Sequence, residues 1–251
     1  MTLNPQEWHE RYSLQATWTS NLRRHLLPKF KPEHRQRILE VGCGSGAVLS
    51  DIISLTSKSQ ICGLDIDLSV LKLAKIYCSG AAFTCGNALH LPYPSNSFDL
   101  CYTHFFLLWV NAPLAALEEM CRVTRHDGYV VAFAEPDYGG RIDYPPSLEE
   151  MGRLQRQALL AQGANPDIGR QLAGLFHKAG LKDIHYGILS GQWSKPPAPE
   201  ERASEWKFLQ HDLKGLLSPE RLKELHTQET LAWQHGERVL FVPTFYAWGQ
   251  K

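Results

Sequence analysis

Apolar runs and amphipathic segments alternate along the first half of the chain. Short apolar runs predict strands at residues 37–41, 60–66, 82–85, 98–103 and 129–134. Between them, apolar residues spaced three and four apart predict helices at 47–54, 68–78 and 113–123. Strands that alternate with helices of about 10–15 residues indicate a parallel sheet with helices on both faces. We therefore expect a doubly wound α/β fold.

The second half predicts further helices and two closing strands. Ser147 followed by Glu150 has the spacing of a capping box, which would open a helix to about residue 162. Other helices are expected at 168–180, 200–213 and 219–234, and strands at 181–193 and 238–248. Pro243 cannot donate a ladder hydrogen bond, so we expect a bulge or an interruption there. The two late helices are expected to be insertions over the sheet, without a core of their own.

The opening segment is polar and aromatic, and its pattern approximates helical spacing over residues 5–27. We expect the whole chain, 1–251, to form a single domain. In this division residues 1–35 are an N-terminal helical lid and 36–137 are the ligand-binding core. Residues 138–251 then supply substrate-side helices and closing strands.

Composition and charge narrow the class of protein. The chain has 26 Lys+Arg and 26 Asp+Glu, and this balance disfavours a general nucleic-acid binder. Hydrophobic residues make up 43% and charged residues 21%, which excludes wholesale disorder. No apolar run approaches the roughly 18 residues of a membrane span. The first residues, MTLNPQEWHERY, lack the apolar centre of a secretory signal. We expect a cytoplasmic protein that does not span a membrane.

Cysteine and histidine patterns do not predict a metal site. The six cysteines contain no C-x-x-C pair, and several fall inside apolar runs, as small buried residues do. A reducing compartment is the simplest interpretation. His9-Glu10 begins an HExxH pattern, but Ser13 stands in the place of the second histidine. No metal is expected.

A glycine turn and an acidic residue at the next strand end predict a nucleoside-type ligand. Gly42, Gly44 and Gly46 permit positive φ and close backbone approach, and the helix that follows presents free N–H groups. Asp65 lies where a carboxylate can accept both hydroxyls of a ribose. The alternative is a plain tight turn beside a helix-capping aspartate. Gly42, Gly44 and Ala47 also satisfy G-x-G-x-x-A, so the turn alone does not separate NAD(P) from S-adenosylmethionine.

Four segments in order resemble the motifs of a known family. They are ILEVGCGSGAVL (38–49), GLDID (63–67), GNALHLPYPSNSFDLCYTHFFL (86–107) and ALEEMCRVTRHDGYVVAFAEPD (116–137). Together they resemble class I S-adenosylmethionine-dependent methyltransferases, in the group that includes small-molecule and quinone-methylating enzymes. The closing FVPTFYAWGQK (241–251) also looks like that group's last strand. The resemblance implies a Rossmann-like, mostly parallel seven-stranded sheet, with a helical lid and a helical insertion before the last strand.

This resemblance also implies where the cofactor binds. Glu40 and the turn at 42–46, which includes Cys43, would hold the methionine end of S-adenosylmethionine. Asp65 would bind the ribose diol, and Ile66 would pack on adenine.

Two further strand ends carry expected site residues. The family usually has an aspartate and a small residue after the third strand, where this chain has Asn87 and Ala88. An amide oxygen still accepts a hydrogen bond from adenine, without the charge that would strengthen it. Thr103 and His104, after the fourth strand, would line the methyl-transfer site.

Aromatic residues outside the sheet predict a lid and an acceptor pocket. They are Trp8, Tyr12, Trp18, Tyr138, Tyr144, Trp193, Trp206 and Phe208. Tyr12 and Trp18 are expected to touch the cofactor, since an opening helix in such enzymes often closes over it. The alternative is that these side chains form ordinary core. Arg141 is expected in a surface ion pair rather than on an acidic substrate.

Three side chains are candidates for acid–base chemistry. Methyl transfer from a sulfonium depends mainly on alignment, and a general base is needed only for a protonated acceptor. His104 is the first candidate because its ordinary pKa lies near neutrality, with a structural histidine as the alternative. Glu135 and Asp137 follow, with loop carboxylates or a helix cap as their alternative.

The sequence thus predicts an S-adenosylmethionine-dependent methyltransferase that acts on a small molecule by direct transfer, with S-adenosylhomocysteine as the product. The alternatives are an NAD(P)-dependent oxidoreductase and a non-catalytic S-adenosylmethionine-binding protein. A macromolecular acceptor is disfavoured by the neutral charge. The methylated atom and the oligomeric state stay open.

Overall fold

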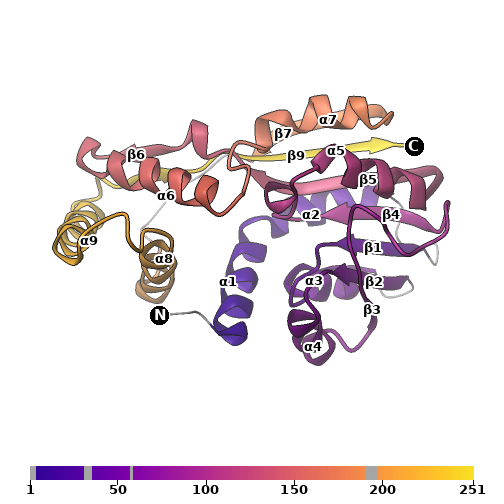
Figure 1. Ribbon diagram of the computed structural model, residues 1–251, viewed down its shortest axis with the longest axis horizontal. Helices are drawn as coiled ribbons and strands as arrows, with labels where there is room; N and C mark the ends of the chain where they lie inside the picture. Colours follow the sequence, from indigo (N-terminus) through magenta and orange to yellow (C-terminus); the bar gives the residue numbers. More distant parts are fainter. Residues whose placement is uncertain (1–3, 31–35, 57–58, 190–196) are drawn as a thin grey trace.

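A seven-stranded sheet forms the centre of the computed structural model, which describes residues 4–30, 36–56, 59–189 and 197–251 (Figure 1). The strand order is β3-β2-β1-β4-β5-β9-β7. The strands are β1 (Arg37–Val41), β2 (Gln60–Asp65), β3 (Ala81–Cys85), β4 (Phe98–Thr103), β5 (Thr124–Pro136), β7 (Lys182–Leu189) and β9 (Thr244–Gln250). Neighbours from β3 to β5 pair in parallel, and β9 is antiparallel to β5 and β7. The expected doubly wound, mostly parallel sheet is confirmed.

The chain reverses its direction of travel across the sheet between β1 and β4. From β1 it proceeds outward to β2 and β3, and then it returns to β4 on the other side of β1. At such a switch point a crevice opens at the carboxyl ends of the strands. Ile38, Leu39 and Val41 bury both faces of β1, so this strand is held firmly where the glycine turn begins.

Helices cover both faces of the sheet, as the alternating pattern predicts. They are α3 (Ala47–Leu55), α4 (Leu68–Tyr77), α5 (Pro113–Val123) and α7 (Leu172–Lys178). Leu117 of α5 and Phe176 of α7 belong to one buried apolar cluster. Leu49 of α3 and Leu71 of α4 belong to a second cluster, on the other side of β1 and β4.

The N-terminal segment folds into two helices that break at Thr19. They are α1 (Pro5–Trp18) and α2 (Ser20–Leu26), followed by a short 3₁₀ helix, η1 (Leu27–Phe30). Asn4 caps α1 in a capping box with Glu7. Whereas α2 buries Leu22 and Leu26 in the core, α1 packs on α3 and α4 beside the crevice. The segment expected to be a lid thus contributes one helix to the core and one beside the crevice.

Past β5, the chain builds helices beside the sheet (Figure 1). The elements are η3 (Tyr138–Gly140), β6 (Ile142–Tyr144), η4 (Pro146–Leu148), α6 (Glu149–Ala161), η5 (Gly169–Gln171), α8 (Pro199–Asp212), α9 (Pro219–Gln234) and β8 (Val239–Phe241). β6 and β8 form an antiparallel pair of their own, which the sequence pattern did not indicate. The closing strand is interrupted at Pro243, between β8 and β9, as expected.

The placement of the late helices differs from the expectation. Leu154 of α6, Trp206 of α8 and Leu225 of α9 pack in a separate buried apolar cluster. The prediction that α8 and α9 lie over the sheet without a core of their own is therefore wrong. Their apolar faces match one another and α6, which is a long-range complementarity that single-segment periodicity does not contain.

Two local predictions also differ from the structure. The Ser147–Glu150 capping box does not form, because a turn of 3₁₀ helix occupies 146–148 and Glu150 binds Arg221 instead. The strand expected at 129–134 begins earlier, because β5 includes Asp127, which has a φ of 63° where the pairing with β4 shifts.

Candidate cofactor site

The glycine turn adopts the backbone conformation that its sequence predicts. Gly42, Gly44 and Gly46 have φ angles of 74°, 51° and 82°. The N–H groups of Gly42 and Cys43 both donate to the carbonyl of Leu64, at 2.8 and 3.0 Å, which fixes the turn to the end of β2. The N-cap of α3 is Gly46, which has no side chain with which to cap the helix. Its first-turn N–H groups are therefore available to an anion.

Asp65 joins the end of β2 to this turn. Its Oδ2 accepts the N–H of Gly44 at 2.8 Å, and its Oδ1 accepts the N–H of Asp67 at 3.0 Å. Each oxygen keeps a lone pair, so the carboxylate can still accept hydroxyl groups. The next side chain, Ile66, is 71% exposed. An apolar side chain that is left open beside a polar one suits the face of a purine ring.

Glu40 lies inside the protein at the end of β1. The Tyr102 hydroxyl donates to Glu40 Oε2 at 3.0 Å. Burial raises the pKa of Glu40 to about 8, although the Tyr102 hydrogen bond and the nearby Arg23 charge act in the opposite direction. A buried carboxyl with one hydrogen bond and a raised pKa is suited to receive a cation.

The lid helix α1 touches the glycine turn through Tyr12 and His9. A methyl group added at Gly44 would lie 3.6 Å from Cε2 of Tyr12, so the tyrosine ring covers this part of the turn. Burial raises the pKa of Tyr12 to about 12, and the carboxylates of Asp65 and Asp67 act in the same direction. His9 Nδ1 lies 2.7 Å from Ser45 Oγ, and its ring stacks on Tyr77 at 3.8 Å.

The contact between His9 and Ser45 was not predicted from the sequence. Trp18, which was expected to touch the cofactor, has other contacts in the structure. Trp18 is 51% exposed, and the Arg11 guanidinium lies 5.2 Å from the centre of its ring. Arg11 in turn pairs with Glu205 of α8. The described contacts of Trp18 thus point toward α8 and not toward the glycine turn.

The end of β3 comes close to Asp65. The N–H of Gly86 donates to the carbonyl of Asp65 at 2.9 Å. Asn87 is exposed, and its Oδ1 accepts the N–H of Leu89 at 2.9 Å, while Ala88 is buried against the core. The Asn87 side chain therefore lies at the crevice, and its oxygen keeps one lone pair for a further donor.

Glu135 holds the loop that follows β4. Its Oε1 accepts the N–H groups of Phe106 and Leu107 and the hydroxyl of Thr103, at 3.0, 2.8 and 3.3 Å. Its Oε2 accepts the N–H of Leu108 at 3.2 Å. Burial raises the pKa of Glu135 to about 7 against these hydrogen bonds, which lower it. The structure thus brings Thr103 and Glu135 together, and most of the hydrogen bonds that this carboxyl accepts come from backbone N–H groups.

The ordered loop places Phe106 on the glycine turn. A methyl group added at Gly42 would lie 2.0 Å from Cδ2 of Phe106, so only a glycine leaves room for the ring. The preceding residue, Phe105, has a φ of 48°, which is strained for a bulky side chain. Phe105 and Phe106 were not predicted as site residues, because in sequence they read as part of an apolar run.

His104 faces the lid. Its Nε2 lies 2.7 Å from Thr19 Oγ1, at the break between α1 and α2. Burial and the positive charge of Arg23 lower the pKa of His104 to about 3. The imidazole is therefore neutral at physiological pH, and a proton would be held weakly.

Asp137, directly after β5, is paired with an arginine. Arg170 donates to both of its carboxylate oxygens, at 2.6 and 2.7 Å, and the N–H of Gly140 donates at 3.2 Å. Asp137 also carries the N-cap of η3. His104, Glu135 and Asp137 therefore have separate hydrogen-bond partners.

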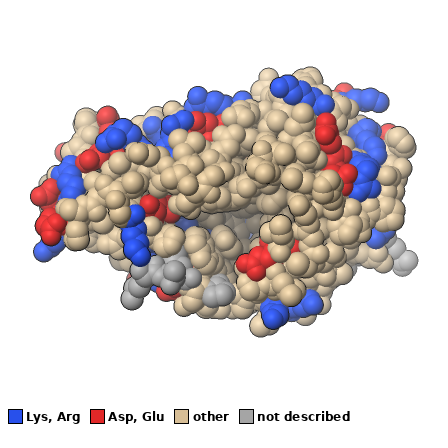
Figure 2. Space-filling model, viewed as in Figure 1, with Lys and Arg blue, Asp and Glu red and all other residues tan. Residues whose placement is uncertain are grey.

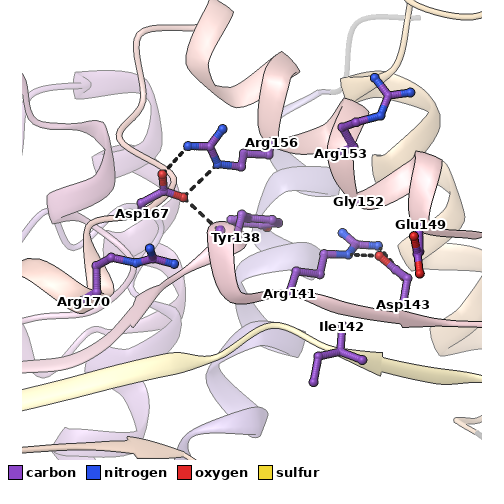
Figure 3. Close-up of a pocket in the computed structure, with 11 residues that line it drawn as sticks. Tyr138, Arg141, Ile142, Asp143, Glu149, Gly152, Arg153, Arg156, Asp167 and Arg170 are labelled. Carbon is purple, nitrogen blue, oxygen red and sulfur yellow. Dashed lines mark hydrogen bonds and ion pairs between the residues drawn. The ribbon is translucent and has the colours of Figure 1, made fainter. Parts of the chain in front are cut away.

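A cavity of about 600 Å³ lies beyond β5, away from the predicted cofactor residues (Figure 3). It is lined by residues 138–170, among them Arg141, Arg153, Arg156 and Arg170. Arg156 points to Asp167 and Arg141 to Asp143. The Arg141–Asp143 ion pair is buried, with side chains 6% and 3% exposed, so the expectation of a surface ion pair is wrong about its location. Asp143 also pairs with Arg238, and Arg170 pairs with Asp137, so Asp143 balances two arginines at once.

Aromatic side chains gather between α1 and α8. The ring of Trp8 lies 5.8 Å from that of Tyr12 and 5.3 Å from that of Phe208. By contrast, Trp206 stacks on His226 in the separate helical core, and Tyr144 is exposed. Trp193 lies outside the described residues. Part of the predicted aromatic set is thus assembled beside the lid, and part of it is core.

Comparison with known proteins agrees with this geometry. Residues 39–132 match the family described as Methyltransferase domain. The chain is 32% identical over 177 residues to a demethylmenaquinone methyltransferase of Bacillus licheniformis, covering 61% of this chain and 73% of that one. The chain belongs to the class I S-adenosylmethionine-dependent methyltransferases. This membership makes it an enzyme that uses S-adenosylmethionine, and it replaces the oxidoreductase alternative.

Other members of the family match over different lengths. An uncharacterized methyltransferase of Schizosaccharomyces pombe is 33% identical over 150 residues, which is 55% of this chain and 54% of that protein. The chain thus spans about half the length of this relative. The solved structure of Haemonchus contortus phosphoethanolamine N-methyltransferase 2 with phosphomonomethylethanolamine and S-adenosylhomocysteine has a TM-score of 0.59 at 17% identity. It covers 92% of this chain and 52% of that one, which shows the shared fold.

Proposed function

We propose that this protein transfers a methyl group directly from S-adenosylmethionine to a small-molecule acceptor. One observation carries the proposal: Asp65, the glycine turn and the Tyr12 ring converge at the carboxyl ends of β1 and β2. The names of two similar proteins, which concern a quinone and a phosphorylated amine, support an acceptor of small size.

The residues at the crevice fit the parts of S-adenosylmethionine. Glu40 would receive the ammonium group, and the N–H groups of the turn and of α3 would receive the carboxylate. Asp65 would accept the ribose hydroxyls, and Ile66 and Asn87 would border adenine. When bound, S-adenosylmethionine supplies a methyl group that its positively charged sulfur activates for displacement.

The acceptor would bind between the lid and the helices beside the sheet. Figure 2 shows a hollow in the middle of one face of the molecule, next to α1. Trp8, Tyr12 and Phe208 gather between α1 and α8 and offer rigid apolar walls. Their chief contribution would be to hold the acceptor in line and to exclude water.

We further propose that His104, Glu135 and Asp137 organise the site and do not remove a proton. A neutral imidazole bound to Thr19, a carboxyl that accepts three N–H groups, and a carboxylate paired with Arg170 support this view. An acceptor that is already a nucleophile, or becomes one in water, needs alignment alone.

We also propose one domain and a cytoplasmic location. β7 and β9, from the last third of the chain, complete the sheet that residues 37–136 begin, which supports a single unit. All six cysteines are unpaired, which supports a reducing compartment. Within the described ranges, no helix has the length and apolar character to cross a membrane.

Calorimetry with S-adenosylmethionine and with NAD tests the cofactor site first. We expect S-adenosylmethionine to bind, NAD to give no heat, and Asp65→Asn to weaken binding about tenfold through loss of a charged acceptor. Asp67→Asn is the matched control, because asparagine caps a helix as well as aspartate and this side chain binds Ser69. Equal effects of the two variants would contradict the assignment of Asp65.

A labelled-methyl assay tests the acceptor. The small-molecule fraction of a cell extract, separated by ultrafiltration, should yield a labelled product that mass spectrometry identifies. Label that appears only in the retained protein or nucleic acid would overturn the small-molecule assignment. Binding without any labelled product would favour a non-catalytic role.

A further inference from the structure

Arg23 is the largest side chain among those that the protein buries completely. It lies on α2, in the N-terminal segment, and is 1% exposed. A buried guanidinium is costly unless its donors are satisfied. Its Nε and Nη2 both donate to Asp51 Oδ2, at 3.0 and 2.7 Å, and Nη2 also donates to the carbonyl of Ala16 at 2.8 Å.

The third guanidinium nitrogen of Arg23, Nη1, begins a hydrogen-bonded connection to the end of β4. Its Nη1 donates to Thr19 Oγ1 at 2.5 Å. The Thr19 hydroxyl lies 3.4 Å from the carbonyl of Ala16 and 2.7 Å from Nε2 of His104, so the nearer imidazole nitrogen is the better acceptor for its proton. A neutral His104 then carries its own proton on Nδ1, in agreement with its lowered pKa.

The resulting hydrogen-bond network, Asp51–Arg23–Thr19–His104, joins three parts of the fold. Asp51 belongs to α3, the helix that the glycine turn opens. Thr19 is the C-cap of α1 and the N-cap of α2, where it has no side-chain hydrogen bond of the capping kind. His104 follows the last residue of β4. This hydrogen-bond network therefore holds the break at Thr19 against α3 on one side of the crevice and against the end of β4 on the other.

We propose that Arg23 is a positioning residue for cofactor binding. By anchoring the break at Thr19, it determines the direction in which α1 leaves the core and so keeps Tyr12 on Gly44 and His9 on Ser45. Arg23 is only 1% exposed, so it does not touch the cofactor; it acts through α1, in addition to the effect of its charge on Glu40. This inference rests on the proposed cofactor site and adds to it a residue outside the family motifs.

Paired variants of Arg23 and Thr19 test this role in the full-length protein. Thr19→Val keeps the shape but removes the hydroxyl, whereas Thr19→Ser restores it. Arg23→Met removes the charge and all of the hydrogen bonds. Arg24→Met is the control, because Arg24 is the exposed neighbour on the same helix.

The readouts are the Kd of S-adenosylhomocysteine and hydrogen exchange of residues 5–18. We expect Arg23→Met and Thr19→Val to raise the Kd about tenfold, the change that loss of 1.4 kcal/mol produces. Hydrogen exchange of the α1 backbone amides should become at least about tenfold faster, while the amides of β1 and β4 stay protected. Thr19→Ser and Arg24→Met should behave like the unaltered protein.

The outcomes separate this inference from the proposed function. If the unaltered protein does not bind S-adenosylhomocysteine, the cofactor site itself is wrong. If it binds and Thr19→Val leaves the Kd within twofold, Arg23 and Thr19 do not position the lid. Should Arg23→Met fail to fold, the comparison of Thr19→Val with Thr19→Ser still decides. Faster exchange in α1 with an unchanged Kd would also overturn the inference.

Discussion

Replacement of Gly42 by alanine should damage the glycine turn for two separable reasons. Gly42 has a φ of 74°, which costs an ordinary residue about 1–2 kcal/mol. The added methyl group would also lie 2.0 Å from Cδ2 of Phe106, where carbon atoms normally stay about 3.5–4 Å apart. Overpacking of this kind costs about 1–3 kcal/mol. We therefore expect Gly42→Ala to lower the free energy of unfolding by about 2–5 kcal/mol.

Gly163 provides the matched control. It also has a positive φ, 83°, but a methyl group there would meet nothing within 4 Å. Gly163→Ala should therefore show only the backbone cost, about 1–2 kcal/mol. Urea unfolding followed by tryptophan fluorescence measures both values, and calorimetry with S-adenosylhomocysteine should show loss of binding for Gly42→Ala alone.

The double variant Gly42→Ala/Phe106→Ala isolates the contact. Without the ring, the methyl group at Gly42 has space, so the two changes should couple by about 1–3 kcal/mol in a double-mutant cycle. Equal losses for Gly42→Ala and Gly163→Ala, or additive losses in the cycle, would refute the steric reasoning.

Three other predictions concern neighbouring groups. The pKa of Glu40 is raised to about 8, so the folded protein keeps a proton that the unfolded chain loses near 4.5. Glu40 should thus contribute a fall in the free energy of unfolding as the pH rises from about 4.5 to about 8, so in urea titrations the stability of the unaltered protein relative to Glu40→Gln should fall over this range. In both proteins Glu135 adds a fall up to about pH 7, and His104, whose pKa is lowered to about 3, adds an opposing rise up to about pH 6.5. Glu135→Ala leaves buried N–H groups without an acceptor and should cost about 3 kcal/mol or more in the same titrations, whereas Glu118→Ala, on an exposed position of α5, should cost almost nothing. Tyr12→Ala should raise the Kd of S-adenosylhomocysteine about tenfold in calorimetry, and Tyr12→Phe should keep it; equal behaviour of the two would show that the ring does not cover the site.

The aspartate and glycine positions were recognisable because their chemistry depends on local geometry. A strand, a turn that needs positive φ and a carboxylate at the next strand end are each encoded by a few consecutive residues. The structure places Asp65 at the strand end beside the glycine turn, as expected, and adds a hydrogen bond from the N–H of Gly44 that was not predicted.

The roles of the buried polar side chains were not recognisable in this way. Glu135 lies near the end of β5, but its partners are N–H groups nearly thirty residues earlier, at Phe106 and Leu107. His104 meets Thr19, 85 residues away. A sequence motif identifies such a residue but not its hydrogen-bond partners. It therefore does not distinguish a proton acceptor in catalysis from a side chain that holds a loop or a helix in place.

The sequence by itself determined the alternation of strands and helices, the doubly wound sheet, the glycine turn and its acidic partner. These features follow from periodicity and from the conformations that single residues allow. Only the tertiary structure decided that α8 and α9 form a core beside the sheet, that Phe106 covers Gly42 and that Arg23 anchors the lid. The physical reason is that burial makes each polar or apolar group depend on whatever lies against it, and that neighbour comes from a distant part of the chain.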